Sequence, residues 1–170
     1  MTRRLFITQG EHCVSADSNA TISTILGSCV ACCLWDPLAQ VGGMNHILLA
    51  TNAGNSSSAL QISGVHAMEL LINDLLKIGA ARERLLAKVF GGAQMIAGLS
   101  NIGPANCDFA LTYLRTEGIA CKAQSLGGDK ARQVIFFPTT GAVRVKTQQT
   151  RVVELMPTTP PDQGSDLELF

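Results

Sequence analysis

Residues 29–49, with CVACCLW, DPLAQ and VGGMNHILL in succession, have the pattern of a buried β-hairpin. Residues 29–35 are uniformly apolar and too few for a surface helix, which is typical of a buried strand. Asp36 to Gln40 form the expected turn, because proline fixes its φ angle and aspartate can bond its own backbone. Residues 41–49 then return as a second strand. The hairpin therefore predicts a β-sheet within the core.

The rest of the chain supplies further strands and two helices. Apolar residues recur at helical spacing in 64–78, and a second helix fits 104–117, with Pro104 in its first turn and Gly118 after its end. Residues 51–63 are rich in Ser, Asn and Gly and predict a loop. Further strands are expected at 5–8, 13–16, 21–26, 85–90, 119–124, 133–137 and 142–148. The expected fold class is α+β, a layered α/β sandwich of mixed or antiparallel sheet with two main helices.

Length and composition predict one folded domain. The chain has 170 residues, of which 46% are apolar and 15% charged, so a core can form and overall disorder is excluded. Residues 1–156 are expected to form this domain. Residues 157–170 carry three prolines, no basic residue and an acidic end, and we expect a disordered tail there.

Charge and hydrophobicity exclude several classes of partner. Thirteen basic residues balance thirteen acidic ones, and phosphate binding needs clustered cations, so no nucleic acid partner is expected. The sequence contains no uninterrupted run of about 18 apolar residues, so no membrane insertion is expected. The N-terminus turns polar too early for a signal peptide. We therefore expect a cytoplasmic protein with reduced cysteines.

Of the six cysteines, Cys29 is singled out by a histidine. Paired residue numbers in an antiparallel hairpin sum to a constant, and a turn centred between Pro37 and Leu38 makes that sum 75. Cys29 then lies directly opposite His46, on the same face of the sheet. A thiol beside an imidazole is the arrangement of a cysteine nucleophile. A register slip of one residue would move the two side chains to opposite faces.

The neighbours of this pair complete a candidate catalytic site. Gly27 and Ser28 form a corner whose backbone N–H groups can point at an oxyanion. A third group usually orients the imidazole, and the upstream hydroxyls of Ser23 and Thr24 are the candidates. Because side chains alternate along a strand, only one of these two hydroxyls faces the site.

Spacing alone leaves two alternatives open. Cys29 can be a core residue, as is expected of the other five cysteines, because cysteine is among the most buried residue types. Cys29 and Cys32 form a Cys-x-x-Cys motif that His46 can extend to a zinc site. On a strand, however, these two thiols point to opposite faces, and the sequence has no second motif of this kind. We therefore expect no metal and no other cofactor.

Several sequence blocks, in order and at matching spacing, resemble the chemoreceptor glutamine deamidases of the CheD family. The resemblance covers about residues 5–150. The blocks are LGSCV at 26–30, GGMNHILL at 42–49, AKVFGGA at 87–93, NIGPAN at 101–106, LGG at 126–128 followed by Arg132, and TGAV at 140–143.

The resemblance implies a cysteine hydrolase, a protein-glutamine glutaminase that converts selected glutamines of bacterial chemoreceptors to glutamate and releases ammonia. Some members are also described as receptor methylesterases. The implied fold is the sandwich shared with the catalytic domain of cytotoxic necrotizing factor toxins. The family's nucleophile falls on Cys29 and its histidine on His46. Its threonine falls on Ser23, with Thr24 next to it.

The resemblance also implies protein partners. The substrate would be a helix of a methyl-accepting chemotaxis protein, and a CheC-type phosphatase would be a second partner. A non-catalytic chemotaxis adaptor that binds the receptor or the phosphatase is the alternative. The presence of both Cys29 and His46 favours an enzyme, because a purely binding surface does not need this pair.

Overall fold

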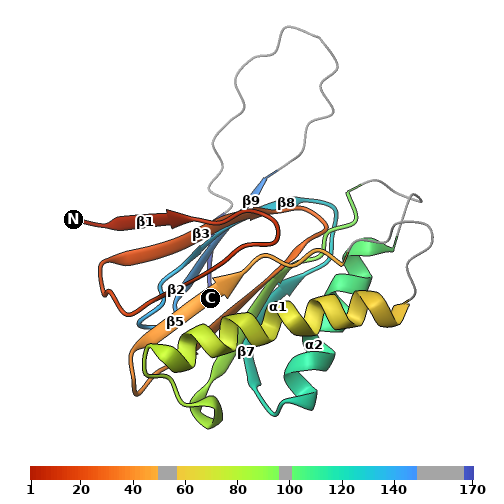
Figure 1. Cartoon of the computed structure of the whole chain (residues 1–170). Helices are drawn as coiled ribbons and strands as arrows, with labels where there is room; N and C mark the ends of the chain where they lie inside the picture. The colour runs from red at the N-terminus through yellow and green to blue at the C-terminus, as the bar shows by residue number, and fades with distance from the viewer. Residues whose placement is uncertain (50–56, 96–100, 149–166) are drawn as a thin grey trace, which may run out of the picture.

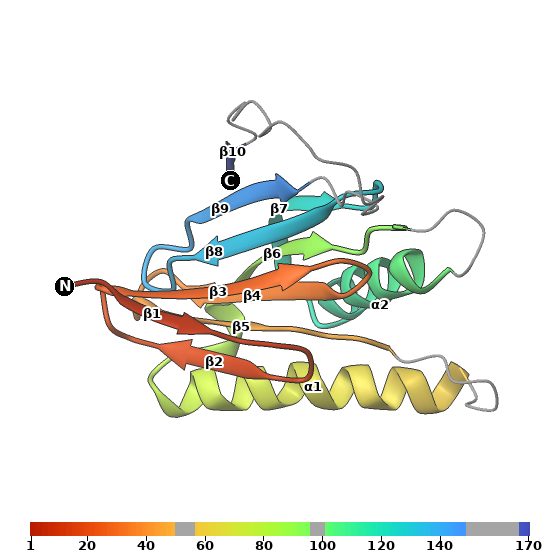
Figure 2. The ribbon, with the colours of Figure 1, turned by 90° about the horizontal axis from the view of Figure 1, so that it is seen from above.

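The computed structural model describes residues 1–49, 57–95, 101–148 and 167–170, the side chains of 57–61 excepted. In this part of the chain, two five-stranded sheets pack face to face, and two α-helices cover the outer face of the second sheet (Figure 1). The layers follow the order first sheet, second sheet, helices (Figure 2). The predicted α+β fold class, with mixed sheets and two main helices, is confirmed.

The first sheet has the strand order β1-β3-β8-β9-β10. β1 and β3 are parallel, and the other neighbours are antiparallel. One face of this sheet packs on the second sheet. Its strands are β1 (Arg3–Phe6), β3 (Ala20–Leu26), β8 (Ala131–Phe136), β9 (Val143–Gln148) and β10 (Leu167–Leu169).

The second sheet has the strand order β2-β5-β4-β6-β7. β6 and β7 are parallel, and the other neighbours are antiparallel. This sheet is the middle layer, so both of its faces are covered. Its strands are β2 (His12–Ser15), β4 (Val30–Asp36), β5 (Val41–Asn45), β6 (Leu86–Gly91) and β7 (Ala120–Leu126).

β4 lies at the centre of the second sheet, and all seven of its residues are buried. The apolar side chains of residues 31, 33 and 35 belong to the core between the two sheets. Those of residues 30, 32 and 34 belong to the core between the second sheet and the helices. A strand covered on both faces explains why this run of sequence is uniformly apolar.

The first helix begins earlier than its sequence predicts. Helix α1 spans Ser57–Lys77, so the predicted loop at 51–63 is wrong from residue 57 onward, and residues 51–56 lie outside the described residues. Gly64 is buried inside this helix, where a Cβ atom would lie 2.5 Å from the ring of Phe109 in α2 (Ile102–Thr116). This glycine permits close helix packing rather than ending the helix. Among the described residues, no helix is long and apolar enough to cross a membrane.

The central hairpin has a register two residues away from the predicted one. Cys33 pairs with Met44, so paired residue numbers sum to 77. The turn holds four residues, 37–40. It is stabilised by the Asp36 carboxylate, which accepts the N–H groups of Leu38 and Ala39 at 3.0 and 3.1 Å. Gln40 closes the turn with a φ angle of 56°. The predicted turn centre was therefore one residue too early.

A shift of two residues keeps every side chain on its own face of the sheet, whereas a shift of one would not. Cys29 packs against the core between the sheets, and the His46 ring also points toward the first sheet. The two side chains therefore share a face, as predicted, but they are diagonal neighbours rather than directly opposed. β5 also ends at Asn45, short of the predicted residue 49, because the Asn45 side chain replaces the main chain in accepting the Cys32 N–H, at 3.0 Å.

The end of the chain differs from the predicted disordered tail. Leu167–Leu169 form β10, which pairs with β9, and Phe170 exchanges two backbone hydrogen bonds of 3.0 Å with Val143. The Phe170 ring meets Phe90 edge to face, with ring centroids 5.6 Å apart. An apolar end can pair with the open edge of β9 and bury its aromatic ring. The tail prediction is wrong for 167–170, and residues 157–166 lie outside the described residues.

Candidate active site

Cys29 lies in the corner between β3 and β4 and is half-buried. The corner turns at one end of the sandwich, beside the end of β6 and the first turns of α2 (Figure 2). Its three carbonyl groups are all held by hydrogen bonds from these elements. Gly27 O accepts from Ala93 N at 3.0 Å, Ser28 O from Asn106 Nδ2 at 2.8 Å, and Cys29 O from Gly92 N at 2.8 Å.

The two glycines after β6 allow this close approach. Gly91 has a φ angle of 113°, and a Cβ atom there would lie 2.2 Å from the Cys29 carbonyl oxygen. Gly92 has a φ angle of 67°, and a Cβ atom there would lie 2.0 Å from the Cys107 sulfur. Glycine is required at both positions, both for the backbone conformation and for the space.

His46 is buried, and its ring is oriented by Thr24. Its Nδ1 lies 2.7 Å from Thr24 Oγ1, and the Thr24 hydroxyl donates to the Ile7 carbonyl, also at 2.7 Å. A hydroxyl has a single hydrogen, so the imidazole must be the donor in the first bond. Nδ1 therefore carries the proton, and Nε2 keeps a free lone pair that can accept one.

The structure distinguishes the two candidate hydroxyls. Thr24 is fully buried and points toward the second sheet, where His46 lies. Ser23 comes directly before Thr24 in β3, so its side chain points to the opposite face. Within the described residues, the one hydrogen bond of the Ser23 hydroxyl is to the Leu5 carbonyl, at 3.5 Å. The position counted from the family resemblance, Ser23, therefore does not contact the histidine, and its neighbour does.

The turn between β1 and β2 holds the backbone of His46. Gly10 N donates to His46 O at 2.9 Å, and His46 N donates to Glu11 O at 3.0 Å. The Glu11 carboxylate is fixed in turn by Thr8, whose backbone N–H lies 2.7 Å from it. This turn therefore fixes the position of the His46 backbone and places the negative charge of Glu11 near the imidazole.

Burial favours the neutral form of both candidate catalytic groups. Burial raises the pKa of the Cys29 thiol. Burial lowers the pKa of His46, and the Glu11 charge opposes that effect only in part. No hydrogen bond joins Cys29 Sγ to the His46 ring within the described residues. The arrangement fits a histidine that takes a proton from the thiol when substrate arrives, rather than a thiolate formed beforehand.

The other cysteine of the Cys-x-x-Cys motif lies away from this site. Cys32 is fully buried in the core between the second sheet and the helices, whereas Cys29 borders the core between the sheets. Their thiols are therefore on opposite faces of the sheet and cannot ligate one ion. Within the described residues, no group of three metal-binding side chains is present.

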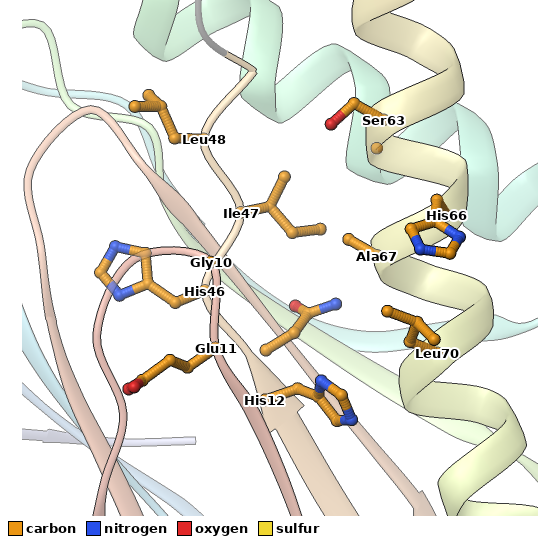
Figure 3. A pocket seen from close by; sticks show the side chains of 12 residues that line it. Gly10, Glu11, His12, His46, Ile47, Leu48, Ser63, His66, Ala67 and Leu70 are labelled. Carbon is orange, nitrogen blue, oxygen red and sulfur yellow. The ribbon is translucent and has the colours of Figure 1, made fainter.

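A pocket of about 200 Å³ opens between the segment of His46 and α1 (Figure 3). Leu70 and Ala67 of α1 line one wall, and Ile47 points at them across it. The His46 ring and the Glu11 side chain point away from α1, toward the first sheet. The His46 ring is therefore not directed at α1.

Comparison with known proteins places the chain in a family. A sequence model described as "CheD chemotactic sensory transduction" matches residues 48–147. The chain belongs to the CheD family. It is 50% identical over 167 residues to "Probable chemoreceptor glutamine deamidase CheD" of Rhizobium leguminosarum bv. trifolii (strain WSM2304), covering 94% of this chain and 91% of that protein.

Other CheD proteins are similarly close. The protein of the same description from Agrobacterium fabrum (strain C58 / ATCC 33970) is 46% identical, over 99% of this chain and 97% of its own. That of Cereibacter sphaeroides (strain ATCC 17029 / ATH 2.4.9) is 54% identical, over 81% of this chain and 69% of its own. Among solved structures, Neisseria meningitidis protein NMB0706 aligns with a TM-score of 0.49 and 9% identity, over 75% of this chain and 63% of that one. This last similarity is too distant to bear on function.

Residues from five of the six sequence blocks that resemble the CheD family lie close to the corner of Cys29. The sixth block, at 140–143, packs against Trp35 at the opposite end of β4. Two residues in these blocks were given no role from the sequence, although their presence in the blocks was a signal. Asn106 is buried and links the Ser28 carbonyl to the Leu49 N–H, at 2.8 and 2.9 Å. Arg132 is 9% exposed and donates to the carbonyls of Gly91 and Gly127, at 3.3 and 2.8 Å. The arginine thereby ties the ends of β6 and β7 together behind the cysteine corner.

Proposed function

We propose that this protein is a cysteine-dependent deamidase, which hydrolyses glutamine side chains of chemoreceptors to glutamate and releases ammonia. Membership of the CheD family and the names of its relatives support the substrate class. The observation that carries the chemistry is the hydrogen bond between Thr24 and His46, which leaves Nε2 free on the face that also bears Cys29.

The proposed reaction begins with proton transfer from the Cys29 thiol to His46 Nε2. The thiolate attacks the side-chain carbonyl carbon of the glutamine and forms a tetrahedral oxyanion, which backbone N–H groups of the corner stabilise. The C–N bond then breaks as the His46 imidazolium gives its proton to the leaving nitrogen, so ammonia departs and a thioester remains. His46 next activates a water molecule, which hydrolyses the thioester to glutamate and restores the thiol.

The same chemistry extends to esters. A glutamyl methyl ester would form the same thioester with methanol as the leaving group, so we propose receptor methylesterase activity as a second reaction of this site.

Binding of a CheC-type phosphatase and action as a non-catalytic adaptor remain predictions from the family resemblance, and no described contact favours either. The six cysteines are free thiols, which supports the proposal that the protein works in the reducing cytoplasm.

The proposed function is tested by mass spectrometry of receptor peptides after incubation with the protein. Each glutamine that is hydrolysed gains about one dalton, the difference between NH₂ and OH in this reaction class. Cys29→Ala is expected to abolish the gain, because the nucleophile is absent.

Cys121→Ala is the matched control, because Cys121 is an exposed thiol on β7. This variant is expected to deamidate at the wild-type rate. Deamidation by Cys29→Ala at the wild-type rate would show that the mechanism is wrong. Receptor binding by the wild-type chain without any mass gain would identify an adaptor instead.

A further inference from the structure

The corner around Cys29 presents two backbone N–H groups, those of Ser28 and Cys29, that have no hydrogen-bond partner within the described residues. The carbonyls on either side of these groups are bonded, to Ala93 N, Asn106 Nδ2 and Gly92 N. Buried or half-buried backbone N–H groups are rarely left without a partner in folded proteins. Unpaired donors beside a candidate nucleophile are the usual components of an oxyanion hole.

The direction of each N–H is set by the carbonyl of the same peptide unit. The described chain has no cis peptide bond, and in a trans unit the C=O and N–H bonds point in opposite directions. The Ser28 carbonyl points at Asn106, so the Cys29 N–H points away from α2. Whatever fixes the Ser28 carbonyl therefore also aims the Cys29 N–H.

The orientation of the Asn106 amide is unambiguous. Leu49 N–H can only donate, so its partner at 2.9 Å must be Oδ1, and the Ser28 carbonyl can only accept, so its partner at 2.8 Å must be Nδ2. The side chain is 1% exposed. The Asn106 amide donates one hydrogen of its NH₂ group to Ser28 O and accepts the Leu49 N–H at its oxygen. It thereby joins the cysteine corner to the segment that follows His46.

The helix that carries Asn106 is itself seated against the site. Gly103, one turn earlier in α2, lies so close to the strand end that a Cβ atom would be 2.6 Å from the carbonyl oxygens of Gly92 and Ala93. The Asn106 amide is therefore positioned by a packed helix rather than by a loop. A group held in this way can keep an oxyanion donor aimed without reorganisation during the reaction.

We infer that Asn106 is a positioning residue for deamidation: its amide holds the Ser28 carbonyl, and this fixes the Cys29 N–H as a donor to the oxyanion of the tetrahedral intermediate. The inference rests on the proposed function and deepens it. Asn106 contacts neither the thiol nor the imidazole, so it affects the stabilisation of the intermediate and not the nucleophile itself.

The test compares two reactions of the same thiol in the full-length chain. Deamidation passes through an oxyanion, whereas alkylation of Cys29 by iodoacetamide is a displacement at carbon that forms none. Asn106→Ala removes both hydrogen bonds of the amide. Asn106→Asp keeps the acceptor for Leu49 N–H and loses the donor to Ser28, so it is the variant to use if the alanine variant does not fold.

Both variants are expected to lower kcat for a receptor peptide by about a hundredfold, the cost of a misplaced oxyanion donor, with KM unchanged. The rate of Cys29 alkylation, followed by peptide mass spectrometry, is expected to stay at the wild-type value. Asn73→Ala, at an exposed asparagine of α1, is the control and should leave both rates unchanged.

Wild-type kcat in both Asn106 variants would overturn the inference. A loss of alkylation in parallel with deamidation would also overturn it, because the residue would then support the thiol or the fold as a whole. These results differ from failure of the proposed function, in which the wild-type chain does not deamidate or Cys29→Ala remains active.

Discussion

At the scale of single residues, the candidate site depends on hydrogen bonds that leave one atom of each reacting group free. Thr24 gives its hydrogen to Ile7, accepts the imidazole proton, and so leaves His46 Nε2 available as a base. The Asn106 amide donates a hydrogen bond to the Ser28 carbonyl, and the Cys29 N–H of the same peptide unit has no partner within the described residues. In both cases a buried polar side chain makes two hydrogen bonds, and the unpaired atom belongs to a neighbouring group.

The role of Thr24 is tested by exchanging its hydroxyl for a methyl group. Thr24→Val keeps the shape of the side chain but leaves both Ile7 O and His46 Nδ1 without their partner, so kcat is expected to fall at least about tenfold. The loss of these two buried hydrogen bonds should also lower the free energy of unfolding, by about 1–3 kcal/mol for each group left without a partner.

Two matched variants separate orientation from packing. Thr24→Ser keeps the hydroxyl and is expected to retain most of the kcat. Ser23→Ala alters the opposite face of β3 and should leave kcat unchanged. Steady-state kinetics on a receptor peptide measures these values, and a larger effect at Ser23 than at Thr24 would contradict the assignment.

At the scale of elements, the end of β6 and the start of α2 together hold the corner that carries the thiol. Gly91 and Gly92 have positive φ angles and bring their backbone against the Cys29 carbonyl and the Cys107 side chain. The sequence pattern GG predicts only a tight turn. The reason for glycine at these two positions is contact with segments more than sixty residues upstream and about fifteen downstream, which no local pattern contains.

The packing requirement at Gly91 is tested against a glycine of nearly the same backbone conformation. Gly79 has a φ angle of 109°, but a Cβ atom there would meet nothing within 4 Å. Gly79→Ala should therefore report the backbone cost alone, about 1–2 kcal/mol in the free energy of unfolding. Gly91→Ala adds a collision with the Cys29 carbonyl and should cost clearly more.

Urea unfolding of both variants, with deamidation assays at 25 °C, provides the comparison. Gly79→Ala is expected to keep wild-type kcat, because it lies after α1 and away from the site. Gly91→Ala is expected to lose most of its activity, since the collision displaces the corner. Equal stability losses and equal activities in the two variants would contradict the packing argument.

At the scale of the whole molecule, the sandwich is closed by the last four residues of the chain. β10 pairs with β9, and the Phe170 ring reaches across to Phe90 in the second sheet. The acidic, proline-containing composition of 157–170 predicts disorder, and it is outweighed at the end of the chain by two leucines and a phenylalanine that match an open sheet edge.

Truncation of the Phe170 side chain tests this closure. Phe170→Ala is expected to lower the free energy of unfolding by about 1–2 kcal/mol, because a partly buried ring loses its contact with the core. Leu169→Ala is the control, since Leu169 is 75% exposed and should have almost no effect. Thermal unfolding measures both, and an unchanged midpoint for Phe170→Ala would show that the end of the chain does not stabilise the sandwich.

The sequence by itself determined the strands before the end of the chain, the α+β class and the shared face of Cys29 and His46. These features follow from short-range periodicity, and the face of a side chain survives a register error of two residues because the strand repeat is two. Only the tertiary structure decided between Ser23 and Thr24, since the histidine approaches β3 from the other sheet. It also decided the role of Asn106, whose partner Ser28 is 78 positions away, because such a contact depends on how the helix packs and not on any local pattern.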